Sequence, residues 1–389
     1  MIGRPVVVAG ARPNFVKVAP LMRSFASRGI DAALVHTGQH YDSVMSGSFF
    51  ESLGIPEPIA NLGVGSGSHA VQTAAVMVAF EEWLSGADAD AVLVVGDVNS
   101  TVACALVAAK AGIPVGHIEA GLRSFDRSMP EEVNRVMVDA VARWLFTPSA
   151  DADENLLAEG VEPARIHRVG NIMVDSLLGS IERARLRPVR AELGLPDPYG
   201  LVTLHRPALV DSPERMRDVM RALDEVGASI PLAFPVHPRT RTMLDRAAIA
   251  VDPSRIRLVE PQPYLDFLAL EAGAALVLTD SGGVQEETTV LGVPCLTLRE
   301  NTERPITITH GTNTLVRFDH DAIVAAARAA RSDPAAPAPI PLWDGLTSER
   351  IVDVLTAATD DPMFVPPAVR GLPAYLAGRS PETIAAASG

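Results

Sequence analysis

The sequence is poor in cysteine and aromatic residues, and it lacks a long uninterrupted apolar run. Two cysteines occur among 389 residues, and phenylalanine, tryptophan and tyrosine together make up 5% of the chain. Cys104 and Cys295 both stand within apolar helix or strand patterns, which predicts buried, reduced thiols rather than a disulfide or a metal site. No apolar run reaches the roughly 18 residues of a membrane-spanning helix, and no basic start precedes a signal-like apolar run. We therefore expect a cytoplasmic protein with no membrane partner.

Positive charge is also scarce. The chain has 33 lysine and arginine residues against 47 aspartate and glutamate residues, a formal net charge of −14. Such a chain is a poor match for nucleic acid or an anionic membrane surface, so an anionic ligand must be held by a local pocket. With 48% hydrophobic and 21% charged residues the composition is globular. The length exceeds the usual limit of one hydrophobic core, so we expect two domains.

Short β-branched runs alternate with longer helical patterns, which predicts an α/β fold with parallel sheets. The first series has strands at 5–9, 32–35, 91–95 and 115–118, with helices at about 14–28 and 101–111. The second has strands at 200–204, 231–235, 257–259, 275–279 and 295–298, with helices at 212–226 and 283–291. A joint is expected near 170–185. Two such Rossmann-like domains facing a cleft would bind a ligand between the carboxyl ends of both sets of strands.

A glycine-bearing turn follows the strand at 275–279, in the run DSGGVQEE at 280–287. Glycines let backbone amides approach a phosphate, and the positive end of the following helix favours the anion. A carboxylate at Glu286 or Glu287 would suit ribose hydroxyls beside that phosphate. The alternative is a plain strand-to-helix connection, in which the two acids only stabilise the first helical turn by about 0.3–1 kcal/mol each.

Acidic residues follow two neighbouring strands of the first series. Asp97 and Glu119 each stand just beyond an apolar strand, so both are aimed at one edge of the sheet. Two carboxylates in a partly dry cleft shift each other's pKa, which suits proton transfer. The alternative for Asp97 is to cap the helix that begins near Ser100.

A third acid comes from the run PEEVNR at 130–135. Pro130 suits the first position of a helix, which puts Glu131 and Glu132 in the first turn, where the helix dipole favours the ionised form. Ordinary helix-start acids have the same pattern. The buried stripe of this helix is predicted to be Val133, Val136, Met137, Ala140, Val141 and Trp144.

Several basic residues also stand at strand ends. Arg12 and Lys17 lie in or after the turn that follows the first strand, His205 and Arg206 end a strand of the second series, and His237 ends another. Arg304 lies in a charged loop, where Glu303 is placed to orient it. A histidine or an arginine at one such position is weak evidence alone. No Cys, His and Asp cluster has metal-site spacing, and no Gly-x-Ser-x-Gly elbow occurs, so neither a metal nor a serine nucleophile is expected.

Together these motifs resemble the non-hydrolysing UDP-N-acetylglucosamine 2-epimerases. They are GARPN at 10–14, TGQH at 37–40, GD at 96–97, HIEAGLR at 117–123, PEEVNR at 130–135, HR at 205–206, DSGGVQEE at 280–287 and TERP at 302–305. The resemblance covers about residues 5–355. It implies the glycosyltransferase-B architecture, as a homodimer, with domains at 1–175 and 176–346, a helix at 347–358 that returns to the first domain, and a tail at 359–389.

The resemblance also implies a reaction without a cofactor. UDP leaves C1 of the sugar as the C2 proton is removed, and it adds back after protonation of the other face of C2. Asp97, Glu119, Glu131 and His205 match catalytic positions, with the acids acting at C2 and His205 at the departing phosphate. The nucleotide-binding positions are Arg12, Lys17, Ser281, Gly282, Gly283, Glu287 and Arg304, with Glu287 at the ribose.

Some members of this family need a second UDP-N-acetylglucosamine as an activator. Gln39, His40, Arg206 and His237 match the region that contacts it, whereas Leu209 replaces an asparagine common in relatives.

A hydrolysing epimerase, which releases UDP and N-acetylmannosamine, fits the 130–132 and 205–207 motifs less well. A glycosyltransferase of the same fold has no use for three acids at C2, and a non-catalytic nucleotide-sugar sensor needs none of them.

Overall fold

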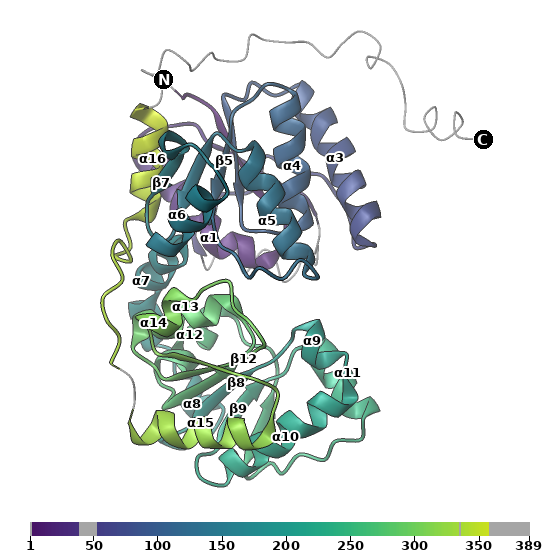
Figure 1. Cartoon of the computed structure of the whole chain (residues 1–389), viewed down its shortest axis with the longest axis vertical. Coiled ribbons are helices and arrows are strands. Elements are labelled where there is room, and N and C mark those ends of the chain that lie inside the picture. Colours follow the sequence, from purple (N-terminus) through teal and green to yellow (C-terminus); the bar gives the residue numbers. More distant parts are fainter. Residues whose placement is uncertain (1, 39–52, 334–335, 358–389) are drawn as a thin grey trace, which may run out of the picture.

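The computed structural model describes residues 2–38, 53–333 and 336–357, with the side chain of Arg12 excepted. Figure 1 shows two α/β domains stacked along the long axis of the molecule. Gln39, His40 and the predicted tail at 359–389 lie outside the described residues. No helix among the described residues is long and apolar enough to cross a membrane.

The first domain is built on a parallel sheet with the strand order β3-β2-β1-β4-β5-β6-β7. Its strands are β1 Pro5–Ala9, β2 Ala33–His36, β3 Ala60–Asn61, β4 Ala91–Val95, β5 Val115–Ile118, β6 Trp144–Thr147 and β7 Ile166–Arg168. Its helices are α1 Arg12–Ser27, α3 His69–Ser85, α4 Asn99–Lys110, α5 Pro130–Val141 and α6 Ala150–Ala158, with a 3-10 turn at Pro163–Arg165. Strands β1 and β4 to β6 are apolar and buried on both faces, because helices cover both sides of the sheet.

The second domain has a parallel sheet with the order β10-β9-β8-β11-β12-β13. Its strands are β8 Gly200–Thr203, β9 Leu232–Pro235, β10 Ile256–Val259, β11 Leu276–Thr279, β12 Cys295–Leu298 and β13 Asn313–Val316. The remaining helices are α7 Ile172–Arg185, α8 Val189–Glu192, α9 Pro207–Val210, α10 Pro213–Gly227, α11 Pro238–Arg246, α12 Tyr264–Ala272, α13 Gly282–Leu291, α14 Ile306–Thr309, α15 His320–Ser332 and α16 Thr347–Ala357. The predicted fold class, two Rossmann-like domains, is confirmed.

The strand order reverses at one place in each sheet. In the first sheet β1 lies between β2 and β4, and in the second β8 lies between β9 and β11. The loops that leave the carboxyl ends of such neighbouring strands run in opposite directions and open a crevice, where open α/β sheets bind ligands. The loops after β4, β8 and β11 carry Asp97, His205, Arg206 and Ser281, and the helices that follow β1 and β11 begin with Arg12 and Gly282.

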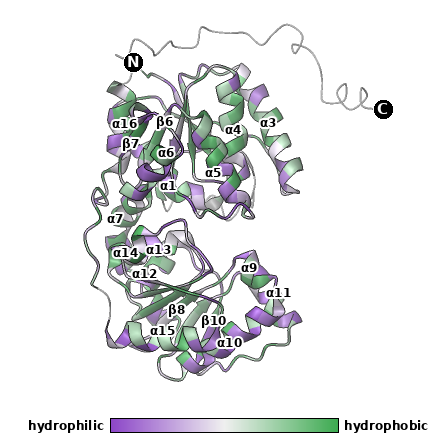
Figure 2. Ribbon diagram, in the orientation of Figure 1, coloured by the Kyte–Doolittle hydropathy of each residue, from purple (hydrophilic) through white to green (hydrophobic). Residues whose placement is uncertain are grey.

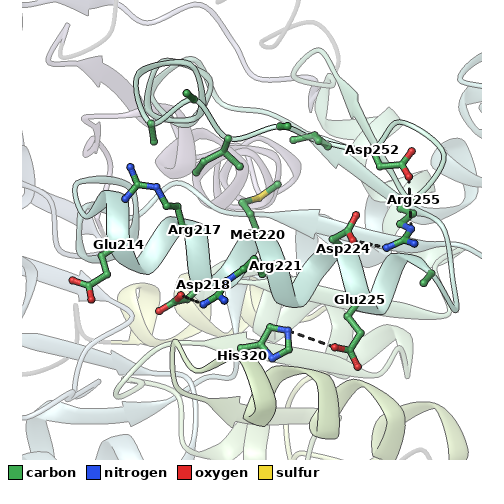
Figure 3. A pocket seen from close by; sticks show the side chains of 16 residues that line it. Glu214, Arg217, Asp218, Met220, Arg221, Asp224, Glu225, Asp252, Arg255 and His320 are labelled. Atoms are coloured by element: carbon green, nitrogen blue, oxygen red, sulfur yellow. Dashed lines mark hydrogen bonds and ion pairs between the residues drawn. The ribbon is translucent and has the colours of Figure 1, made fainter.

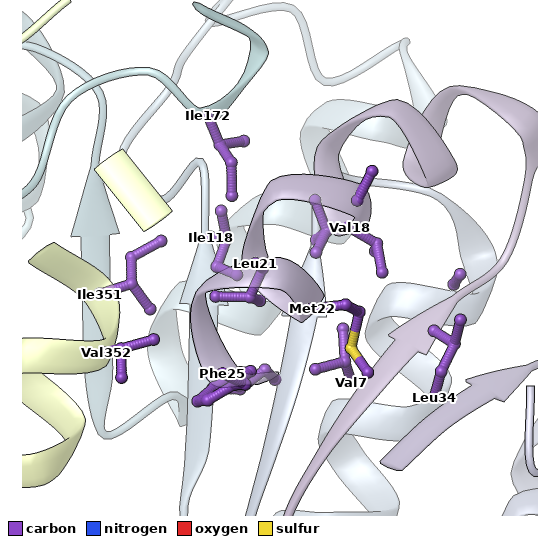
Figure 4. Close-up of a cluster of buried hydrophobic side chains, with 14 of the residues drawn as sticks. Val7, Val18, Leu21, Met22, Phe25, Leu34, Ile118, Ile172, Ile351 and Val352 are labelled. Atoms are coloured by element: carbon purple, nitrogen blue, oxygen red, sulfur yellow. The ribbon is translucent and has the colours of Figure 1, made fainter. Parts of the chain in front are cut away.

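The last described helix belongs to the core of the first domain. Ile351 and Val352 of α16 are fully buried and lie beside Phe25 and Leu21 of α1 in Figure 4. Asp175 of α7 holds the start of α16, because its carboxylate accepts hydrogen bonds from the amides of residues 347 and 348 at 3.0 and 2.7 Å. The chain therefore leaves the first domain through α7 and returns to it at α16.

The predicted buried stripe of α5 is wrong. Val133, Met137 and Val141 are 37%, 41% and 36% exposed, and Trp144 begins β6 instead of ending the helix. The inner face of α5 carries Glu132, Arg135, Val138 and Asp139, because Arg135 and Asp139 form buried ion pairs with residues at strand ends. Apolar periodicity alone therefore assigned the wrong face to the core.

Both cysteines are buried and free, as predicted. Burial raises the pKa of the Cys295 thiol to about 12 and that of the Cys104 thiol further still. Neither thiol is available as a nucleophile at neutral pH.

Candidate active site

Asp97 stands just beyond β4 and is held by an arginine from α5. Arg135 Nη2 lies 2.5 Å from Asp97 Oδ2, and the Asp97 side chain is 30% exposed. Burial would raise the pKa of Asp97, but the charges of Arg135 and Lys17 and the hydrogen bond from Arg135 lower it below its ordinary value. The capping alternative does not hold, since α4 begins at Asn99 without a side-chain cap. Asp97 is therefore an ionised, partly accessible carboxylate at the switch point.

Glu119 follows β5 in a backbone conformation that is rare outside glycine. Its φ is +72°, a left-handed value that costs about 1–3 kcal/mol and is concentrated at functional sites. Its carboxylate lies 2.5 Å from Lys17 Nζ of α1, and both side chains are largely buried. Glu119 Oε1 is buried, with no hydrogen-bond partner among the residues that the structure describes. The predicted phosphate ligand Lys17 thus neutralises a predicted catalytic acid.

Gly96 leaves room for this pair. It too has a left-handed backbone, with φ +69°, and a Cβ there would stand 3.5 Å from Glu119 Oε2 and 3.6 Å from Lys17 Nζ. The turn after β4 therefore lies against the Glu119 carboxylate, which brings two of the three predicted acids to one place.

Glu131 lies in the first turn of α5, as predicted, but the adjacent Glu132 is the acid that is held by an ion pair and hydrogen bonds. Pro130 begins α5 and Glu131 is half-buried in its first turn. Glu132 is 2% exposed, and it binds Arg135 at 2.8 Å and the amides of residues 124 and 125 at 2.9 and 3.1 Å. Glu132 is thus a structural acid that fixes Arg135, whereas Glu131 is left free for solvent or ligand.

In the second domain Asp280 organises the loop after β8. Asp280 is fully buried, and its carboxylate accepts hydrogen bonds from the amides of His205 and Arg206 at 2.9 and 2.8 Å. His205 Nδ1 lies 3.1 Å from Asp280 Oδ1, and the imidazole is 43% exposed. Burial would raise the pKa of Asp280, but its contacts with residues 205 and 206 lower it. The arrangement orients Nδ1 of His205 towards Asp280.

The glycine turn before α13 is shaped by Arg304. A Cβ on Gly282 would stand 2.5 Å from Arg304 Nη1, so only glycine fits there. Arg304 Nε lies 2.7 Å from Glu286 Oε1, and its Nη1 contacts Glu303. Glu286 is therefore a buried ion-pair partner and not a first-turn surface acid, so the helix-stabilising alternative does not describe it.

The two carboxylates that pair with Arg304 have pKa values shifted in opposite directions, downwards for Glu303 and upwards for Glu286. Glu303 also binds Arg299 at 2.7 Å and lies 3.6 Å from Arg206. Burial opposes ionisation of Glu303, but the three arginines hold its pKa well below the usual range. Burial raises the pKa of Glu286, and the nearby charge of Glu119 in the other domain adds to it. The charges of the two domains are thus close enough to act on each other.

Glu287 lies in a carboxyl-rich pocket. Tyr264 donates a hydrogen bond to Glu287 Oε1 at 3.3 Å, and Glu271 of α12 is fully buried, with neither carboxyl oxygen satisfied by a hydrogen bond among the described residues. Burial raises the pKa of Glu287 to about 7, although the hydrogen bond from Tyr264 and the closeness of Glu271 oppose the rise. Burial and the charge of Glu287 raise the pKa of Glu271 well above its ordinary value.

Charged groups from both domains face each other across the boundary. Asn301 donates a hydrogen bond to Asp126 Oδ2 at 3.2 Å, which joins the loop after β12 to the loop after β5. Glu303 raises the pKa of Asp97, although it is outweighed by Arg135 and Lys17, and the charge of Glu119 raises the pKa of Arg304. The structure therefore brings seven of the predicted site residues to this boundary: Asp97, Glu119, Lys17, His205, Gly282, Arg304 and Arg206.

The remaining predicted residues are placed differently. Ser281 and Gly283 flank Gly282, and Gly283 faces α7, with its Cβ position 3.5 Å from Met173 Cε. His237 is exposed at the start of α11, with its ring 6.4 Å from that of His205. Leu209 is fully buried in the core of the second domain. An apolar side chain at this position therefore packs inward from the turn that carries His205.

Sequence reasoning gave no role to Asp280 or to Arg135, although both stood within the quoted motifs. Asp280 had the same signal as Asp97, an acid directly after an apolar strand. Arg135 had none, because only the folded α5 places it beneath the end of β4.

The pocket drawn in Figure 3 lies elsewhere, against α10 and the loop at 247–255. Its lining is charged, for example Arg217, Asp224 and Arg255, and includes none of the predicted site residues. Within residues 2–38, 53–333 and 336–357 no group of three or more His, Cys, Asp or Glu side chains is arranged to hold a metal ion.

Two parallel-sheet α/β domains, with ionised groups at their facing strand ends, define a protein of the glycosyltransferase-B type. A family model described as UDP-N-acetylglucosamine 2-epimerase matches residues 23–356. UDP-N-acetylglucosamine 2-epimerase of Methanocaldococcus jannaschii is 42% identical over 359 residues, covering 90% of this chain and 98% of that protein. The chain therefore belongs to the UDP-N-acetylglucosamine 2-epimerase family, and it is an isomerase.

Two further relatives bear on ligand and substrate. The crystal structure of the Methanocaldococcus jannaschii epimerase in complex with UDP-GlcNAc and UDP has a TM-score of 0.86 at 41% identity, covering 91% of this chain and 99% of that chain. UDP-2,3-diacetamido-2,3-dideoxy-D-glucuronate 2-epimerase of Pseudomonas aeruginosa is 40% identical, covering 83% of this chain and 91% of that protein. Relatives at similar identity thus differ in the sugar that their names give.

Proposed function

We propose that the protein interconverts UDP-N-acetylglucosamine and UDP-N-acetylmannosamine without hydrolysis and without a cofactor. The observation that carries the proposal is the contact between the domains, where Asn301 donates a hydrogen bond to Asp126. Beside it, Glu119 lies close enough to Arg304 and Glu286, and Asp97 close enough to Glu303, for their charges to act on each other. It supports a diphosphate held at the turn before α13, with the sugar at the acids of the first domain.

In the proposed reaction the first domain supplies the groups that move the proton at C2, and the second domain binds the UDP leaving group. One carboxylate removes the C2 proton as the bond from C1 to the UDP oxygen breaks, which gives 2-acetamidoglucal and UDP. A proton is then delivered to the opposite face of C2 while the C1–O bond reforms. Asp97, Glu119 and Glu131 are the proposed acid and base groups, and His205, oriented by Asp280, is the proposed partner of the departing phosphate.

The test is incubation with UDP-N-acetylglucosamine in deuterated water, followed by NMR. Deuterium at C2 of a product that still carries UDP is the expected result. Free UDP with free N-acetylmannosamine would replace the proposal by a hydrolysing epimerase. No isotope uptake in the absence of an acceptor would leave a glycosyltransferase or a nucleotide-sugar sensor.

A parallel incubation with UDP-2,3-diacetamido-2,3-dideoxy-D-glucuronate tests the sugar. We expect faster exchange with UDP-N-acetylglucosamine, because the family model and the Methanocaldococcus jannaschii protein carry that name over most of the chain. Faster exchange with the diacetamido glucuronate would transfer the assignment to that substrate.

The nucleotide site is proposed to bind UDP more weakly as the pH falls through about 7. Glu287, whose pKa is raised to about 7, is the proposed acceptor for ribose hydroxyls, and its ionised form accepts both hydroxyl hydrogens. Protonation removes one acceptor, so the Kd for UDP rises below that pH. Calorimetry between about pH 5.5 and 8.5 measures the effect. A Glu287→Gln variant is the control, since its affinity should be weaker and independent of pH; an equal slope in both proteins would remove Glu287 from the effect.

Activation by a second UDP-N-acetylglucosamine molecule is also proposed, at Arg206 and His237 together with Gln39 and His40. The support is that Arg206 and His237 both flank the exposed imidazole of His205. The domain limits of 1–175 and 176–346 and a cytoplasmic location are likewise proposed, as the sequence indicates.

A homodimer is proposed through the apolar helix face, defined as the exposed side chains of Val71 and Val78 on α3 and Val133, Met137 and Val141 on α5. Both helices flank α4, which is largely hydrophobic in Figure 2. Contiguous exposed apolar residues of this kind mark interaction surfaces.

Met137→Lys is expected to convert the dimer into a monomer, because a charge placed in an apolar contact is costly to bury. Light scattering on a sizing column measures the mass. Leu186→Lys is the matched control, since Leu186 is 84% exposed on another surface and its substitution should leave the mass unchanged. A dimer that persists in the Met137 variant would place the interface elsewhere.

A further inference from the structure

His117 lies in β5, two residues before Glu119. Its side chain is completely buried, and both of its ring nitrogens make hydrogen bonds. Its Nδ1 lies 2.6 Å from Asp139 Oδ1 of α5, and its Nε2 lies 2.9 Å from the carbonyl oxygen of Gly96. No part of the imidazole is in contact with solvent.

The two partners of the ring leave few choices for its protons. A backbone carbonyl oxygen only accepts hydrogen bonds, so Nε2 must carry a proton. An ionised carboxylate also only accepts, so Nδ1 must then carry a second proton, which makes the ring an imidazolium. The alternative is a protonated Asp139 beside a neutral ring.

The surroundings of Asp139 decide between these states. Its other oxygen, Oδ2, accepts a hydrogen bond from the amide of Gly121 at 3.1 Å and lies 2.7 Å from Arg123 Nη1. Burial would raise the pKa of Asp139, but His117 and Arg123 lower it. Two donors on Oδ2, one of them a guanidinium, favour the carboxylate over the acid, and the carboxylate demands a doubly protonated His117.

The charges around the ring balance. Arg123 is paired a second time, through Nε, with Glu159 Oε1 at 2.7 Å. The group therefore holds the two positive charges of His117 and Arg123 and the two negative charges of Asp139 and Glu159, of which Glu159 reaches solvent with 38% of its side chain exposed. A buried charge without such pairing would be strongly unfavourable.

The same contacts reach all three segments that carry the proposed acids. Gly96 O belongs to the peptide that leads into Asp97. Glu119 lies between His117 and Gly121, both of which bind Asp139. Asp139 lies on α5, the helix that begins with Glu131. Loss of the imidazole would free the Gly96 carbonyl and loosen the turn on which Asp97 stands.

We propose that His117 is a doubly protonated positioning residue, whose imidazolium clamps the Gly96–Asp97 peptide to α5 and so sets the spacing of the acids. The part of this inference that concerns catalysis rests on the proposed epimerase function. The protonation state does not, and it can be measured in the resting protein.

The direct test is nitrogen-15 NMR of the histidine rings in the full chain. The chain has nine histidines, and the signals of His117 are those that vanish in a His117→Phe variant. Both of its ring nitrogens are expected to carry a proton at neutral pH, because each faces an oxygen that only accepts hydrogen bonds. A ring nitrogen without a proton at neutral pH would overturn the proposal, whether or not the protein is an epimerase.

The second test compares two variants by the isotope exchange described above. His117→Phe keeps a ring but releases the Gly96 carbonyl, and it should lower kcat by about 10²-fold through misplacement of Asp97. The Kd for UDP should stay unchanged, because the turn that holds UDP lies in the other domain. Equal loss of kcat and UDP affinity would indicate a general structural role and contradict the proposal.

Asp139→Asn provides the conservative comparison. It also keeps the proposal testable if the His117→Phe protein does not fold. An asparagine amide donates to Nδ1 while its oxygen accepts from Gly121 and Arg123, so every contact survives and the ring becomes neutral. Its NMR spectrum should show one unprotonated ring nitrogen, with kcat retained to a greater extent than in His117→Phe. Two protonated nitrogens in this variant would show that Asp139 does not hold the second proton, against the proposal.

Discussion

Replacement of Asp97 by asparagine is expected to lower the rate of deuterium incorporation at C2 by about 10³-fold, in the range that a positioned acid or base contributes. The amide has the shape of the carboxylate and can still meet Arg135, but it cannot take up or release the proton. The affinity for UDP should stay close to that of the unmodified protein, because Asp97 is not among the proposed nucleotide contacts and most of those contacts lie in the second domain. Isotope exchange and calorimetry with UDP measure the two effects.

Asp88→Asn is the matched control. Asp88 lies in the same domain, 73% exposed and 3.3 Å from Arg4, so the same chemical change on the surface should leave exchange unaltered. Retained turnover in the Asp97 variant would remove Asp97 from the mechanism. Loss of UDP affinity together with turnover would instead assign Asp97 to the fit between the domains.

Arg304→Met is expected to destabilise the protein by about 3–5 kcal/mol, the usual cost of removing one partner from a buried ion pair. The substitution leaves Glu286 and Glu303, both about 2% exposed, without the guanidinium that lies between them. UDP affinity should fall as well, because the proposed diphosphate site loses its buried cation. Urea denaturation and calorimetry give the two quantities.

The stability deficit of this variant should depend on pH. In the intact protein the pKa of Glu303 is held well below its usual range, so this acid contributes stability at neutral pH that is lost as the pH falls through its folded pKa. Without Arg304 the pKa values of both acids rise, and the folded state is penalised for keeping them ionised. The deficit should therefore be largest near pH 7 and smaller near about pH 5.

Arg328→Met is the control for this prediction. Arg328 pairs with Glu225 at 2.6 Å, but its side chain is 73% exposed, and such surface pairs contribute about 0–1 kcal/mol. A deficit of similar size in the two variants, or one that does not vary with pH, would contradict the role given to the buried Arg304 group.

The fold followed from local patterns wherever a strand was apolar on both faces. Strands β4, β5 and β12 have the predicted bounds, 91–95, 115–118 and 295–298. The strands β3, β6 and β13 were not predicted, and β6 was missed because Trp144 was assigned to the buried stripe of the preceding helix. Strand β3 has two residues, and β13 alternates with polar positions at the edge of its sheet, so neither has the apolar run that identifies a buried strand.

The site was predictable as far as it consists of acids and glycines at strand ends. Asp97, Glu119 and Gly282 were identified in that way, because the carboxyl ends of parallel strands meet at one edge. Arg135, which pairs with Asp97, was not, since only the fold brings α5 beneath the end of β4. Arg304 was identified as a nucleotide contact, but its ion pair with Glu286 was not. The inward face of α5 was misassigned for the same reason: two ion pairs, and not apolar contact, decide which side of that helix is buried.

The return of α16 to the first domain has a consequence for how the chain folds as it is synthesised. Ile351, Val352 and Leu355 complete a hydrophobic core whose other members precede residue 175. A ribosome-bound chain that has released only its first half lacks these side chains, so that core stays open to solvent until the second half has been made. The amino-terminal half alone is therefore a poor candidate for independent expression, and supplying residues 336–357 as a separate peptide should improve its folding.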